Sequence, residues 1–157
     1  MYRLWVFIHL VGAAGFLAAH GVSMYALFAV RAVDGDRERI LGWCEASKRT
    51  TMPMYVSFVL LLFGGVAAAI DGALFAQAWL LGSLALLLLL TVLMSMVASP
   101  HMKGLREGCT RWADGSYTMS DQELRAALTG PATMITASMG GIGLLVILYL
   151  MVFKPWA

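Results

Sequence analysis

Charged residues are scarce in this chain of 157 residues, of which 13% are charged and 61% are hydrophobic. Soluble globular domains contain about a quarter charged residues, and a single core of this size cannot bury such an apolar excess. We therefore expect a lipid bilayer to cover the apolar surface. The 11 basic and 9 acidic residues leave a formal net charge of only +2, which argues against a nucleic-acid partner.

Cysteine is equally scarce, with Cys44 and Cys109 as the only two in the chain. They form no CxxC pair, so the sequence predicts neither a zinc site nor a thioredoxin-type motif. Both fall in connections between apolar segments, where we expect free thiols because the cytosol keeps thiols reduced. Nucleophile motifs, glycine-rich phosphate loops and paired carboxylates are also missing. Hydrolysis and phosphoryl transfer therefore have no support, and the sequence leaves open whether the chain is an enzyme.

Four long apolar segments are present, at residues 4–30, 54–70, 74–98 and 133–153. A helix needs about 17 to 25 residues to cross some 30 Å of hydrocarbon, and each segment is long enough. Within lipid, only a helix satisfies every backbone polar group inside one segment. The sequence therefore predicts an all-α polytopic membrane protein, with residues 1–157 forming one antiparallel bundle of four transmembrane helices.

The two long polar connections contain signals for further helices. Residues 36–49 predict a short amphipathic helix in the headgroup region, and Pro53 then suits the first turn of the second span. Ser120 followed by Glu123 predicts a capping box, which would begin another short helix in the second long connection.

Three glycines of the last span predict a close helix contact, because small residues let backbones approach each other in lipid. These glycines are Gly140, Gly141 and Gly143. We expect all three to face another helix.

Basic residues are unevenly divided between the two sides of the predicted bundle. Only Arg3 and Lys154 lie on the side of the termini, and the two long connections contain the other nine, namely Arg31, Arg37, Arg39, Lys48, Arg49, Lys103, Arg106, Arg111 and Arg125. The positive-inside rule therefore predicts that both long connections are cytoplasmic and both termini are outside.

His9 and His20 are the only ionisable residues within the predicted spans. Such residues are candidates for function because a charged or polar group in lipid is costly. The spans lack a carboxylate or lysine relay, which argues against a proton-coupled transporter. Eleven residues separate the two histidines, so they share one helix face about 16 Å apart and cannot bind one ion or one haem together.

Methionines are expected at comparable depths on the other spans. Imidazole and thioether are a ligand set for copper(I) and a known axial pair for haem iron. The candidate haem ligands are His9, His20, Met54, Met139 and Met151, and the candidate copper ligands are His20 and Met24. The alternative is structural, because methionine commonly fills gaps in cores and a buried histidine can bond to a neighbouring helix.

Several short motifs resemble those of a group of small four-span bacterial membrane proteins. They are Trp5-Val6-Phe7-Ile8-His9-Leu10, Arg39-Ile40-Leu41, Met52-Pro53-Met54, Gly64-Gly65 and Leu150-Met151-Val152-Phe153-Lys154-Pro155. The group comprises the copper-resistance protein D domain and the HemJ-type protoporphyrinogen oxidases. The resemblance implies a bacterial inner-membrane location and a b-type haem on His9. The third span lacks the lysine of the HemJ type, which points to an uncharacterised branch of the group.

These observations lead to one main functional hypothesis and two alternatives. The main hypothesis is a membrane protein that binds a redox cofactor, b-type haem, in its bundle and assists membrane electron transfer. The alternatives are a copper-handling protein that uses the same ligands and a cofactor-free accessory subunit of a respiratory or other membrane complex. The sequence leaves homo-oligomer formation open.

Overall fold

The computed structural model describes residues 1–155, together with all of their side chains except those of residues 132, 133 and 136. Its helices are α1 (Tyr2–Ala32), α2 (Arg37–Asp71), the short 3₁₀ helix η1 (Leu74–Ala76), α3 (Ala78–Cys109), α4 (Asp121–Thr129) and α5 (Ala132–Phe153). Within residues 1–155, extended pairing is limited to one isolated bridge between Arg111 and Tyr117. The predicted all-α class is therefore confirmed.

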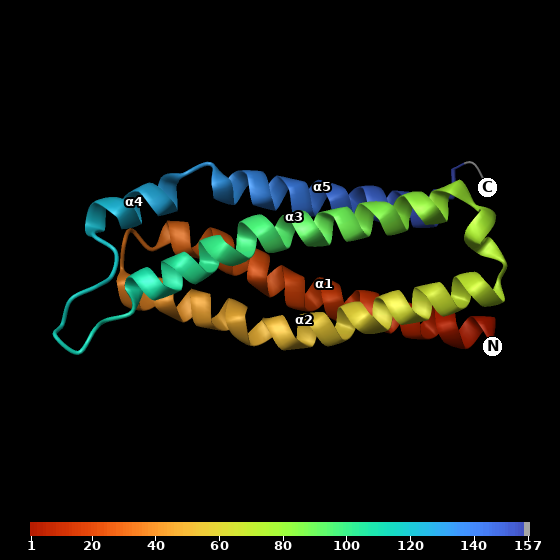
Figure 1. Cartoon of the computed structure of the whole chain (residues 1–157), viewed down its shortest axis with the longest axis horizontal. Coiled ribbons are helices and arrows are strands. Elements are labelled where there is room, and N and C mark those ends of the chain that lie inside the picture. The colour runs from red at the N-terminus through yellow and green to blue at the C-terminus, as the bar shows by residue number, and fades with distance from the viewer. Residues whose placement is uncertain (156–157) are drawn as a thin grey trace.

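The four longest helices lie along a common axis and alternate in direction (Figure 1). Both termini and the α2–α3 connection lie at one end, which we call the terminal end. The α1–α2 connection and α4 lie at the other, which we call the loop end. Among the described residues, α1, α2 and α3 are long and apolar enough to cross a membrane, and α5 adds a shorter apolar segment, Ala137–Phe153. The fold is that of a polytopic membrane protein.

The bundle consists of two helix pairs, because α1 packs chiefly against α2 and α3 chiefly against α5. Glycines bring α1 and α2 together. A Cβ atom at Gly12 would overlap the backbone of Leu61, and one at Gly64 would lie 2.5 Å from the backbone nitrogen of His9. Such close backbone approach is the usual basis of helix association in lipid, where burial of apolar side chains gives no advantage.

The glycines of α5 divide between two faces of the helix. Gly140 and Gly143 are buried, and Cβ atoms there would meet Met94 and Leu90 of α3. Gly141 is exposed, with no described neighbour within 4 Å of a Cβ atom. The expectation for Gly141 was therefore wrong. Residues three apart share a helix face, whereas adjacent residues do not.

Two prolines lie inside helices, contrary to our expectations for the long connections. Pro53 lies within α2, so residues 36–49 belong to the same 35-residue helix and do not form a separate one. Pro100 lies within α3, which extends to Cys109. A proline removes one backbone hydrogen bond, yet both helices continue through it here. Cys44 and Cys109 are therefore helical residues.

The capping box of α4 is confirmed. The Ser120 hydroxyl accepts from the Glu123 backbone nitrogen at 3.3 Å, and the Glu123 carboxylate accepts from the Ser120 backbone nitrogen at 2.8 Å. The box fixes where α4 begins, so that Leu124 and Leu128 point into the loop end.

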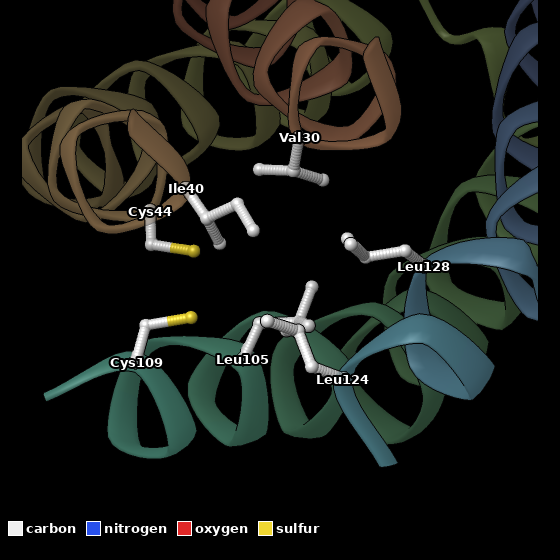
Figure 2. Packing of buried hydrophobic residues seen from close by; sticks show 7 residues of the cluster. All are labelled: Val30, Ile40, Cys44, Leu105, Cys109, Leu124 and Leu128. Carbon is white, nitrogen blue, oxygen red and sulfur yellow. The ribbon is translucent and has the colours of Figure 1, made fainter. Parts of the chain in front are cut away.

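At the loop end, α1, α2, α3 and α4 enclose a small hydrophobic core, which we call the loop-end core (Figure 2). Its members are Val30, Ile40, Cys44, Leu105, Cys109, Leu124 and Leu128. Large apolar side chains on the outer faces of the long helices are exposed instead, such as Phe7, Phe63 and Leu145. The loop-end core therefore joins the two helix pairs beyond their apolar spans.

Candidate functional site: a cavity between the helix pairs

Between the two helix pairs lies a cavity of about 400 Å³, towards the loop end. Its walls include His20 and Met24 of α1, Met54 of α2, Met94 of α3 and Gly140 of α5. Every long helix therefore contributes to it. Cavities of some 300 to 1,000 Å³ with mainly apolar walls and a few polar groups are typical of small-molecule sites.

His20 is the polar group on the cavity wall that most needs a partner. Its Nε2 atom is buried and has no hydrogen-bond partner among the residues that the structure describes. The ring stacks on Phe16, with centroids 5.6 Å apart and planes 9° from parallel. A buried polar atom is normally satisfied, and an exception points to a missing ligand, ion or water. The stacked ring is therefore held ready to accept a ligand.

Gly140 leaves space beside this histidine. A Cβ atom at Gly140 would lie 3.7 Å from His20 Nε2 and 3.7 Å from Met94 Sδ. The His20 imidazole of α1 and the Met94 thioether of α3 thus lie beside the same position of α5, where Gly140 has no side chain. One nitrogen and one sulfur donor from different helices are a known ligand pair for haem iron, and both donor types bind copper(I).

Methionines border the cavity on three helices, at Met24, Met54, Met94 and Met102. The structure thus brings three of the predicted candidates, His20, Met24 and Met54, to one site. The other two candidate methionines, Met139 and Met151, are half-buried and do not line it.

His9 occupies a different environment. Its Nδ1 atom lies 2.8 Å from the Leu61 carbonyl oxygen of α2, so the ring donates a hydrogen bond there. The ring also fills the space beside Gly65, where a Cβ atom would lie 2.8 Å from Nδ1. His9 does not line the cavity. The contact with α2 matches the structural alternative for a buried histidine.

The cavity has a cationic border at its loop end. Lys48, Lys103 and Arg106 lie there, where Glu45 pairs with Arg106 at 3.4 Å and Glu107 pairs with Lys103 at 3.8 Å. This border therefore has a surplus of positive charge. Together with the apolar walls, it suits an amphipathic ligand with anionic groups at one end.

Two of these features were not predicted from the sequence, namely Met102 and the cationic border. Met102, Lys103 and Arg106 lie beyond residue 98, where we expected the third helix to end. Together with Met94 and Leu105, these residues recur at about 3.6-residue spacing. This periodicity could have predicted that the helix continues through Pro100.

Comparison with known proteins gives one family. The family model described as "Predicted integral membrane protein (DUF2269)" matches residues 3–155, almost the whole chain. No curated protein and no solved structure matches the chain.

Proposed function

The chain belongs to the DUF2269 family of predicted integral membrane proteins, and we propose that it binds a b-type haem in the cavity between its helix pairs and assists membrane electron transfer. The observation that carries this proposal is His20 Nε2, which is buried beside the cavity and has no hydrogen-bond partner among the described side chains. Bound haem would supply a one-electron redox couple.

The residues of the cavity fit a haem in three respects. His20 offers a nitrogen ligand from one helix pair, and Met94 offers a sulfur ligand from the other. Phe16, Phe58 and Leu87 supply apolar walls for a flat macrocycle. Lys48, together with Lys103 and Arg106, which also pair with Glu107 and Glu45, would supply the positive charge that faces the propionates.

Each residue has a separate task in this proposal. Phe16 fixes the orientation of the His20 ring by stacking, and the apolar walls keep water away from its Nε2 atom. The neutral imidazole is the form that binds metal, so binding weakens as pH falls through the histidine range. Bound through Met94 and His20, a haem would have a higher reduction potential than one bound through two histidines.

Copper(I) is the second candidate ligand, because four thioethers and one imidazole line the same cavity. Soft sulfur donors select this ion. Copper would need only His20 and neighbouring methionines such as Met24 and Met54, and would make no use of the cationic border. If neither haem nor copper(I) binds, the chain is a cofactor-free accessory subunit.

We further propose that the loop end faces the cytoplasm of a bacterial inner membrane. The nine basic residues of the two long connections lie in α4, in the parts of α1, α2 and α3 that reach the loop end, or between these helices, whereas Arg3 and Lys154 lie near the termini. The positive-inside rule then places the cationic border of the cavity at the inner leaflet.

The test is a reduced-minus-oxidised absorption spectrum of protein expressed with ample haem precursor. The wild type is expected to show a Soret band, which His20→Ala abolishes. The matched variant His9→Ala should retain it, because His9 bonds to Leu61 away from the cavity. Loss of the band in His9→Ala alone would transfer the ligand role to that residue. Copper without a Soret band would favour the second candidate, and well-folded wild-type protein with neither would refute both.

A further inference from the structure

The two cysteines of the chain, 65 positions apart in sequence, meet in the loop-end core. Cys44 comes from α2 and Cys109 is the last residue of α3, and each is 3% exposed. Figure 2 shows the two side chains on facing helices, with both sulfur atoms directed to the same side, into the loop-end core. Both are free thiols. Nothing in the cavity or its proposed ligand accounts for this pairing.

We propose that Cys44 and Cys109 are a reversible oxidation site, at which a disulfide closes between α2 and α3. The oxidant is a low-molecular-weight disulfide of the glutathione type. In the first exchange, one protein thiolate attacks this disulfide and releases one small thiol, which leaves a mixed disulfide on the protein. In the second, the other cysteine attacks the mixed disulfide and releases the second small thiol. Two protein thiols are oxidised, one external disulfide is reduced, and the two protons pass to the released thiolates.

The structure indicates which cysteine reacts first. Cys109 ends α3, and a helix end opens locally more readily than a helix interior, where Cys44 lies. The adjacent residue, Gly108, is tied down by Arg37, whose Nη1 donates to its carbonyl oxygen at 3.0 Å. Opening at this contact exposes Cys109 to the oxidant, and Cys44 resolves the mixed disulfide when the end closes again.

Burial in the loop-end core makes the reaction slow. Desolvation raises the pKa of both thiols, and attack requires the thiolate. Three charged groups act on the pair, with Arg37 favouring the Cys109 thiolate, Arg106 favouring that of Cys44 and Glu45 opposing it. The site therefore responds to sustained oxidising conditions and not to brief ones.

The bond would act on the border of the cavity. Cys44 itself lines the cavity, close to Lys48 and Arg106, and Cys109 lies outside it. A disulfide would hold this part of α2 against the end of α3 and would limit separation of the helix pairs at the loop end. The proposal does not depend on the ligand in the cavity, so it stands or fails separately from haem binding.

The experiment uses the purified full-length chain in detergent, treated with oxidised glutathione at a fixed pH. Free thiols are then alkylated in denaturant, and the intact mass is measured. We expect a monomer that has lost two hydrogens and takes up no alkyl group, and that regains both thiols on reduction. Cys44→Ser should instead accumulate a mixed disulfide on Cys109. Arg37→Gln should accelerate the reaction several-fold, because it releases Gly108.

Three results would overturn the proposal. These are two alkylated thiols in the wild type after prolonged treatment, a stable mixed disulfide on the wild type, and a covalent dimer in place of the internal bond. The wild-type result decides between these outcomes even where a cysteine variant does not fold.

Discussion

Arg37 bonds to Asp121 across 84 positions of sequence, with Nη2 2.6 Å from Oδ1. The guanidinium is nearly buried, at 11% exposure, whereas the carboxylate is 88% exposed. The same guanidinium donates to the carbonyl oxygens of Gly108 at 3.0 Å and Met119 at 2.8 Å, and lies 4.3 Å from the Tyr117 ring centroid. Arg37 thereby ties the start of α2 to the end of α3 and the segment that leads to α4.

We therefore predict that Arg37→Ala lowers stability more than Asp121→Asn does. Loss of the guanidinium leaves two carbonyl oxygens without their donor, at about 1 to 3 kcal/mol each. Loss of the exposed carboxylate should have little effect, because exposed ion pairs contribute little. Thermal unfolding in detergent measures both. Equal melting temperatures for the two variants would contradict the assigned role of Arg37.

The glycines of α5 give a matched pair of variants. Gly143→Leu would force a side chain into Leu90 and should destabilise the protein by about 1 to 3 kcal/mol, the usual range for overpacking. Gly141→Leu adds a side chain on an exposed face and should be neutral or slightly stabilising. The comparison requires melting temperatures in one detergent. A larger loss for Gly141→Leu would mean that α5 is rotated about its axis.

The helix class and the α4 cap could be predicted from local sequence, whereas the continuity of α2 and α3 could not. Ser120 and Glu123 are enough to predict the start of α4, because the capping box involves only neighbouring residues. Whether a helix continues through Pro53 or Pro100 depends on tertiary contacts, which a single sequence does not show. The roles of His9 and His20 raise the same difficulty. They share a predicted face, yet His9 bonds to α2 and His20 borders the cavity, and the spacing within one helix does not show which neighbour each residue meets.

Cys44 should titrate far outside the ordinary thiol range. Burial, and next the neighbouring Cys109, raises the pKa of the Cys44 thiol from 9.0 to about 11. The thiolate is less favourable in the folded state than in the unfolded state, so the Cys44 thiol affects how the free energy of unfolding depends on pH. Its stabilising contribution is fully present below pH 9 and is lost as pH rises from 9 to about 11. We expect the alkylation rate of Cys44 in native Cys109→Ser protein to keep rising above pH 9, because burial still raises the Cys44 pKa when Cys109 is removed. A plateau near pH 9 would show an accessible, ordinary thiol.

Membrane orientation needs new cysteines, because the native thiols are too buried to report it. We predict that an impermeant maleimide leaves Gln122→Cys, in α4, unlabelled in intact cells and labels Arg3→Cys, near the N-terminus. Both positions are exposed in the structure. The wild type controls for the native cysteines and should stay unlabelled. The reverse pattern would place the loop end outside and contradict the orientation drawn from the basic residues.

The central claim is that a haem lies where His20, Met94 and Gly140 meet. The most direct measurement is the haem content per protein of the wild type, Gly140→Val and Gly141→Val, purified side by side and matched for folding by circular dichroism. A side chain at Gly140 would project toward His20 Nε2 and Met94 Sδ, whereas one at Gly141 would point away from the bundle. We predict that Gly140→Val loses most of its haem and that Gly141→Val keeps the wild-type content. Equal haem in the two folded variants would contradict the account.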